Sequence, residues 1–138
     1  MYQELALQIA QKAHAGQVDK AGKDYILHPM TVASYMDTDI EKTIAYLHDV
    51  LEDTDVTVDA LRKIFPNEIV DTLITLTHRK DESYFEYIQR VSKSKLAKKV
   101  KVADLLHNLD ITRIKEPTKQ DYTRLEKYKK SILYLTTH

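Results

Sequence analysis

Apolar residues recur at spacings of three and four along most of the chain, and no stretch of any length alternates apolar with polar positions. This periodicity is typical of amphipathic helices, and only two glycines and three prolines interrupt it. The sequence therefore predicts an all-α fold, a compact bundle of about seven or eight helices. With 138 residues the chain has the size of one domain with a buried core, spanning residues 1–138.

Caps and apolar faces locate the predicted helices. Thr38 with Glu41, and Thr118 with Asp121, have the spacing of capping boxes, in which side chains satisfy the backbone donors of the first turn. The helices are expected at about residues 2–15, 29–35, 38–53, 57–65, 69–76, 83–91 (or from 81), 94–108 and 118–135. Residues 16–29 hold both glycines and form the longest irregular segment, and such loops often carry function.

Composition narrows the functional classes. Lys and Arg together number 21, as do Asp and Glu, so the zero net charge offers no overall field to attract nucleic acid or an anionic membrane. No run approaches the roughly 20 apolar residues of a membrane span, and the first residues lack a signal-peptide pattern, so we expect a cytoplasmic protein. The absence of cysteine leaves histidines and carboxylates as the available metal ligands.

One apolar segment, residues 45–54, carries an unusual density of charge. It places His48 beside Asp49 and repeats acidic side chains one helical turn later, at Glu52 and Asp53. Charges this close to buried apolar residues are costly unless they are paired or coordinated, and a divalent cation is the simplest compensation. A solvated helix face accounts for this arrangement less well, so the segment predicts an ion site.

Other residues extend this candidate set. His28 lies just before a predicted helix, and Asp104 lies one turn before Asn108 on an apolar helix. Two imidazoles and two carboxylates suit Mn²⁺, Zn²⁺ or Fe²⁺. The spacing alone does not prove that they converge. His28 could be an ordinary loop residue, and Asp104 and Asn108, which share one helix face, could be a hydrogen-bonding pair in helix packing. The remaining histidines rank last as site residues. His14 ends a helix and His138 ends the chain, where free imidazoles are common. His78 could satisfy a helix C-terminus or help to meet an anion.

The order His28, His48–Asp49, Asp104 is similar to the H…HD…D pattern of the HD-domain metal-dependent phosphohydrolases. Five surrounding sequences resemble the hydrolase domain of the RelA/SpoT family: AHAGQ at 13–17, KAG at 20–22, YILHP at 25–29, LHDVLEDT at 47–54 and VADLLHN at 102–108. The resemblance covers about residues 10–113, and the chain is similar to a stand-alone small alarmone hydrolase.

The resemblance implies an HD-type helical domain that binds one Mn²⁺ ion. In this family the ligands correspond to His28, His48, Asp49 and Asp104. Glu52 and Asp53 then orient and deprotonate the attacking water, although either could instead only hold a ligating imidazole in place. The implied reaction removes the 3′-pyrophosphate from guanosine tetra- or pentaphosphate.

The resemblance also implies contacts to the nucleotide. Asn108 matches a residue that contacts the ribose, and the loop from Lys20 to Tyr25 lies beside the base and phosphates. Arg113 is suited to a bidentate phosphate contact. Two further cations are candidates for the same task, Arg79 and Lys101.

Two loop positions depart from the family pattern. Asp19 stands where a basic residue is usual and Asp24 where proline is usual, and carboxylates there would repel an anionic nucleotide. The residues therefore support metal-dependent phosphohydrolysis more strongly than they support the guanine alarmone as substrate. One alternative keeps the site but takes NADPH, another phosphorylated nucleotide or a nucleoside monophosphate. The other is a helical binding module whose metal is structural or whose activity has decayed.

Overall fold

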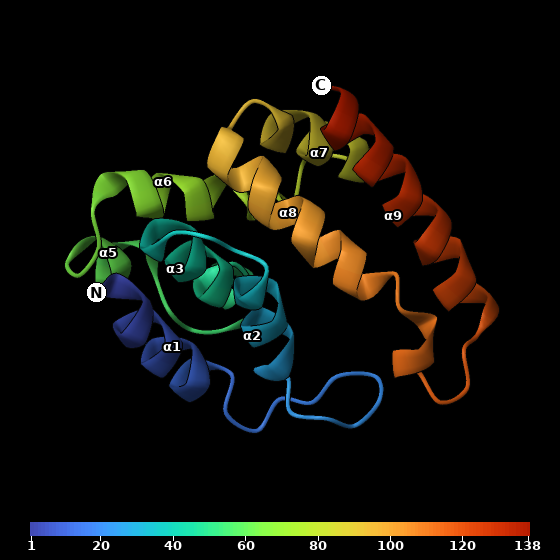
Figure 1. The fold of residues 1–138 in the computed structure, drawn as a ribbon, viewed down its shortest axis with the longest axis horizontal. Coiled ribbons are helices and arrows are strands. Elements are labelled where there is room, and N and C mark those ends of the chain that lie inside the picture. The colour runs from blue at the N-terminus through green and yellow to red at the C-terminus, as the bar shows by residue number, and fades with distance from the viewer.

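The computed structural model describes all 138 residues and confirms the all-α fold (Figure 1). Nine α-helices and a short 3₁₀ helix follow one another along the chain. They are α1 (Tyr2–Ala13), α2 (Leu27–Ser34), α3 (Asp39–Leu47), α4 (Val50–Asp53), α5 (Val58–Arg62), α6 (Asn67–Thr75), α7 (Tyr84–Ser92), α8 (Lys95–Asn108), η1 (Ile111–Arg113) and α9 (Lys119–Thr137). The structure contains no candidate membrane-spanning helix.

The predicted capping boxes start two of the helices. The Thr38 hydroxyl accepts a hydrogen bond from the Glu41 backbone N–H, and the Glu41 carboxylate accepts one from the Thr38 N–H. Thr118 and Asp121 make the same exchange at the start of α9. These local signals explain why the sequence places most helix starts correctly.

The prediction of one helix over residues 38–53 is wrong, because the chain turns at His48 and Asp49 between α3 and α4. In a continuous helix the Ala45 carbonyl would accept a hydrogen bond from the Asp49 backbone N–H. Here that oxygen accepts one from the His48 ring at 2.6 Å and one from the His48 backbone N–H at 3.4 Å. The ring therefore takes part in ending α3, and this break accounts for the ninth helix.

The core lies around α3, which packs against α1, α2 and α6, while α8 packs against α2, α7 and α9. Figure 1 shows α9 running alongside α8, on the side away from α1. The largest wholly buried side chains of this core include Ile44 and Leu47 of α3, Leu73 of α6 and Leu105 of α8. Because α2 touches both α3 and α8, the start of α2, the end of α3 and the middle of α8 meet in one place.

Candidate metal centre and active site

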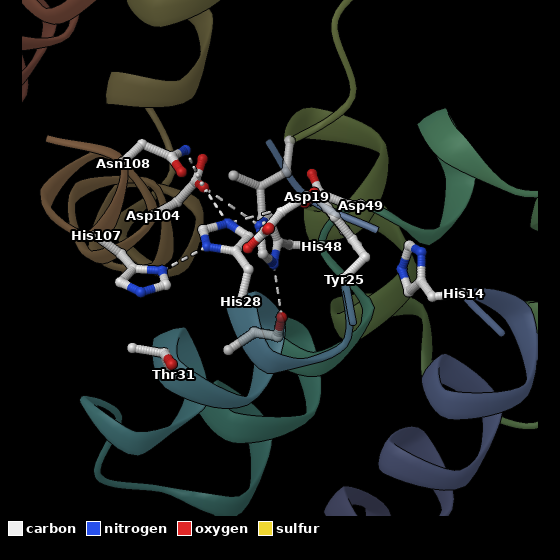
Figure 2. Close-up of polar contacts among 12 residues, drawn as sticks. His14, Asp19, Tyr25, His28, Thr31, His48, Asp49, Asp104, His107 and Asn108 are labelled. Atoms are coloured by element: carbon white, nitrogen blue, oxygen red, sulfur yellow. Dashed lines mark hydrogen bonds and ion pairs between the residues drawn. The ribbon is translucent and has the colours of Figure 1, made fainter. Parts of the chain in front are cut away.

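Three residues from three elements converge at this meeting point (Figure 2). His28 comes from the first turn of α2, His48 from the turn after α3 and Asp104 from α8, and all three are buried. One ligand atom of each lies within 4.8 Å of the others. The His28 Nε2 atom is 2.7 Å from Asp104 Oδ1, and His48 Nε2 is 3.5 Å from the same oxygen.

Asp49 completes the set of four predicted ligands. Its Oδ2 atom lies 3.0 Å from His48 Nε2 and 4.0 Å from His28 Nε2. The structure therefore brings together side chains that are up to 76 positions apart in the sequence. Asp49 is partly buried, whereas the other three are buried. Two imidazole nitrogens and two carboxylates in such a cluster are a donor set for a divalent transition metal.

The hydrogen bonding of His48 fits such an ion. Its Nδ1 atom donates to the Ala45 carbonyl oxygen at 2.6 Å, so the neutral ring carries its lone pair on Nε2. The Nε2 atom is buried and makes no hydrogen bond, although the oxygens of Asp49 and Asp104 are near. Burial lowers the pKa of His48, but these two carboxylates outweigh it and raise the pKa well above the ordinary value. A bound cation would therefore replace a proton here.

His107 orients His28. The two Nδ1 atoms are 2.7 Å apart and the rings stack with their centroids 5.0 Å apart. Burial, together with the charges of Arg113 and His28, lowers the pKa of His107 to about 4, so His107 is neutral near pH 7. The contact with His107 engages His28 Nδ1, so Nε2 is the ring atom that faces Asp104 and the cluster. An outer partner of this kind is usual for metal-binding histidines.

Both candidate carboxylate ligands are held in their charged form. Burial raises the pKa of Asp104, but Lys101 and the two imidazoles outweigh it and keep the pKa well below its usual range. Lys101 Nζ donates to Asp104 Oδ2 at 2.8 Å, so this lysine is engaged inside the protein and does not line the cavity described below. Burial likewise raises the pKa of Asp49, and the adjacent His48 more than offsets it.

Tyr25 links the ion site to the loop between α1 and α2. Its hydroxyl donates to Asp49 Oδ2, and burial together with the Asp49 charge raises the pKa of Tyr25 far above its ordinary value. The phenol therefore stays protonated and orients Asp49. Because Tyr25 also lines the neighbouring cavity, it retains the position expected of a substrate contact.

Glu52 and Asp53, the predicted catalytic pair, have different surroundings. The Glu52 carboxylate accepts the backbone N–H of His78 at 2.9 Å, which ties α4 to the segment after α6. Desolvation and the nearby charges of Asp49 and Glu52 raise the pKa of Asp53. A raised pKa makes a carboxylate a better proton acceptor near neutral pH. Both side chains are exposed and neither lines the cavity described below, so their catalytic roles stay a prediction.

A cavity of about 310 Å³ adjoins the ion site, with His28 and Tyr25 in its wall. The other predicted substrate-binding residues, Lys20, Asn108 and Arg113, also line it, whereas Arg79 does not. The α9 residues that also line the cavity were missed as site residues, and they include Arg124 and Tyr128. No motif marks them, since they reach the cavity only because α9 packs on α8.

The cations of this cavity are paired with carboxylates. Asp121 Oδ1 is 2.7 Å from Lys20 Nζ and 3.1 Å from Arg124 Nη1, and Arg113 Nη2 is 3.7 Å from Asp19 Oδ2. The formal charges of the lining sum to zero, because the three cations face three acids: Lys20, Arg113 and Arg124 against Asp19, Asp110 and Asp121. A polyanion that enters must compete with these carboxylates.

The three histidines that were ranked last as site residues differ in their surroundings. His138 is exposed at the end of α9, as expected. His78 is held by a hydrogen bond from its ring to the Glu82 carbonyl and stacks on Tyr87. The expectation that the His14 imidazole is free at the end of its helix is wrong, because this side chain is buried with only 2% of its surface exposed.

Fold and site together define an all-helical domain with a buried histidine–aspartate cluster that can hold a divalent cation beside a cavity. The HD domain family matches residues 6–130, and the chain belongs to this family. The resemblance to RelA/SpoT-type hydrolase domains is confirmed by the relatives described next.

Two relatives from bacteria are much longer proteins. A guanosine-3′,5′-bis(diphosphate) 3′-pyrophosphohydrolase of Borreliella burgdorferi is 35% identical over 132 residues, which cover 84% of this chain and 20% of the relative. A probable GTP pyrophosphokinase of Mycobacterium leprae is 31% identical over 128 residues, which cover 83% of this chain and 16% of the relative. The chain thus spans a fifth or less of their length.

A solved structure matches over nearly the whole chain. It is a metazoan orthologue of SpoT, described as hydrolysing ppGpp and as playing a role in starvation responses. The TM-score is 0.82 at 25% sequence identity, and the match covers 97% of this chain and 84% of that one. The HD fold is therefore shared from α1 to α9.

Proposed function

We propose that the chain is a single Mn²⁺-dependent hydrolase domain that removes pyrophosphate from the 3′ position of guanosine tetra- or pentaphosphate. The observation that carries the proposal is the convergence of His28, His48 and Asp104, with Asp49 beside them, next to a cavity whose wall contains His28. The predicted substrate contacts Lys20, Tyr25, Asn108 and Arg113 line the same cavity. The activities of the Borreliella burgdorferi relative and of the metazoan orthologue support the choice of substrate.

The proposed division of labour follows from the contacts. When bound by the four predicted ligands, Mn²⁺ would lower the pKa of water and offset charge on phosphoryl oxygens. Asp53 accepts the proton of the attacking water, and Glu52 holds α4 in place through the His78 backbone. The water oxygen forms a bond to the phosphorus attached to the 3′-oxygen. The bond between this phosphorus and the 3′-oxygen breaks, and the 3′-oxygen takes up a proton as pyrophosphate leaves.

The nucleotide would lie in the cavity next to the cluster. Asn108 joins the two parts of the site, because its Nδ2 donates to Asp104 Oδ1 at 3.2 Å and its Oδ1 accepts from Arg113 Nη1 at 3.3 Å. We assign the ribose to Asn108. The phosphates are assigned to the paired cations Lys20, Arg113 and Arg124, which the substrate must draw away from their carboxylates.

One observation favours a second candidate substrate. Asp19 forms part of the cavity wall, and its Oδ2 faces Arg113, where the family usually has a basic residue. The balanced charge of the lining suits a nucleotide that carries fewer phosphates than guanosine tetraphosphate. The second candidate is therefore release of orthophosphate by the same metal site from NADPH, another phosphorylated nucleotide or a nucleoside monophosphate.

Metal content and product analysis test both candidates. The purified protein is assayed for bound metal and incubated in Mn²⁺ with the alarmone, NADPH and nucleoside monophosphates. Release of pyrophosphate from the alarmone supports the first proposal, and release of orthophosphate from another nucleotide supports the second. Saturable nucleotide binding without turnover of any of these compounds would contradict both proposals and would identify the domain as a binding module. His138→Ala is the matched control, since His138 lies at the exposed end of α9.

A further inference from the structure

His14 is a buried histidine that the proposed reaction does not use. It follows the last residue of α1, and its ring is enclosed by the protein. The Nδ1 atom lies 2.9 Å from Gln17 Oε1, whereas the Nε2 atom is buried without any hydrogen-bond partner. A buried polar atom without a partner is costly, so an apolar side chain would fill this space at a lower cost.

The contacts of Gln17 determine which His14 nitrogen carries the proton. Gln17 Nε2 donates to the Asp53 carbonyl oxygen at 3.0 Å, so the amide oxygen of Gln17 is the atom that faces His14. An amide oxygen can only accept, and His14 Nδ1 must therefore be the donor. Gln17, itself anchored on Asp53, thus holds the His14 ring in one orientation.

The held ring packs against Tyr25. The centroids of the His14 and Tyr25 rings are 4.9 Å apart, and the centroid of the His28 ring lies 5.9 Å from that of Tyr25. Figure 2 shows Tyr25 between His14 and the histidines of the ion site. The Tyr25 hydroxyl donates to Asp49, so the chain of contacts runs from Gln17 through His14 and Tyr25 to a predicted metal ligand.

We propose that His14 is a positioning residue of the metal centre, which acts through Tyr25 to hold the Asp49 carboxylate in the orientation that metal binding requires. This inference rests on the proposed metal site. Histidine suits the task because it combines an aromatic face for Tyr25 with a donor for Gln17. Phenylalanine would supply only the aromatic face for Tyr25, and asparagine only the donor for Gln17. Histidine supplies both, and its unpartnered Nε2 atom follows from that combination.

The test measures the Mn²⁺ dissociation constant of the full chain by titration calorimetry. Loss of an outer-sphere partner commonly weakens metal binding about 10- to 100-fold, and we expect Tyr25→Phe to fall in that range. His14→Asn keeps the donor but removes the ring, so it should approach the loss of Tyr25→Phe. His14→Phe keeps the ring and should lose less. His138→Asn is the exposed control and should bind as the wild type does.

The double variant His14→Asn/Tyr25→Phe gives the decisive comparison. Because His14 acts through Tyr25, the double variant should bind Mn²⁺ within about twofold of Tyr25→Phe alone. Losses that multiply in the double variant, or an unchanged dissociation constant in folded His14→Asn, would overturn the inference. Turnover of the alarmone by the wild type is measured separately, so failure of the proposed reaction is distinguishable from failure of this role.

A measurement on the unaltered protein covers the case in which a variant does not fold. The ¹⁵N shifts of the His14 ring report which nitrogen is protonated. The geometry predicts a protonated Nδ1 and a lone pair on Nε2. A proton on Nε2 alone would break the contact with Gln17 that holds the ring and would overturn the inference.

Discussion

Lys101 and Asp104 face each other across one turn of α8, with Lys101 Nζ 2.8 Å from Asp104 Oδ2. The other oxygen of Asp104, Oδ1, lies 2.7 Å from His28 Nε2. The lysine thus occupies one carboxylate oxygen and leaves the second for the cluster. Because Lys101 is 13% exposed and Asp104 is 6% exposed, each charge depends on the other inside the protein.

Lys101→Met should destabilise the metal-free protein. It leaves the Asp104 charge buried without its cation, and removal of one partner of a buried pair costs on the order of 3 kcal/mol. Chemical denaturation measures the loss. Asp104→Asn added to Lys101→Met removes the isolated charge and should restore part of the stability. Equal stability of Lys101→Met and the wild type would show that the pair contributes nothing.

Asp104→Ala and Glu52→Ala should separate metal binding from catalysis. Asp104 contributes an oxygen that lies 2.7 Å from His28 Nε2 and 3.5 Å from His48 Nε2, so its loss should abolish both bound metal and turnover. Glu52 accepts only the His78 backbone N–H, so Glu52→Ala should retain metal and lose rate. Metal analysis and turnover assays on the same preparations decide. Loss of metal from the Glu52 variant would contradict the division of roles.

The metal cluster could be predicted from sequence, and so could the hydrogen bond between Asp104 and Asn108, but other contacts around the cluster were missed. His48 and Asp49 are conspicuous because they interrupt an apolar run, and the family pattern supplied His28 and Asp104. The turn at His48 was missed because a ring-to-carbonyl bond ends α3 there, and apolar periodicity does not record such a bond. Three-residue spacing could have indicated Lys101 as the Asp104 partner, since such pairs meet on helices.

Residues of the cavity and of the α1 end were harder to find. Arg124 and Tyr128 lie on a helix whose apolar pattern shows which face is buried but not which neighbour covers it. His14 was expected to be free because it ends a helix, where exposure is common. Its burial depends on the loop that returns Gln17 and Tyr25 to its ring, and that path is a property of the tertiary fold.

Acid should weaken the segment between α6 and α7. Hydrogen bonds from Arg90 lower the pKa of Glu82 to about 2, below its ordinary value of 4.5. Between pH 4.5 and pH 2 the Glu82 carboxyl is therefore protonated in the unfolded chain but charged in the folded chain. The contribution of Glu82 to the free energy of unfolding is complete above pH 4.5 and is lost as the pH falls towards 2. Denaturation at pH 6 and pH 3 should show a larger loss for the wild type than for Glu82→Gln. Parallel losses would contradict the assignment.

Asp121→Asn should improve binding of a polyanionic substrate. One oxygen of Asp121 holds both Lys20 and Arg124, and a neutral amide would release these cations to the phosphates. Asparagine can still accept from the Thr118 backbone N–H, so the capping of α9 is retained.

The measurement for Asp121→Asn is KM against salt concentration, with the neighbouring exposed Glu126→Gln as a control of equal charge change. At low salt we expect a several-fold lower KM in Asp121→Asn, because two cations lose a competing carboxylate. The advantage should shrink as salt screens the phosphates. Glu126→Gln should leave KM unchanged, since Glu126 pairs only with Lys129 and does not line the cavity. An equal decrease of KM in both variants would show that the effect comes from net charge. It would contradict a specific role of Asp121 in substrate binding.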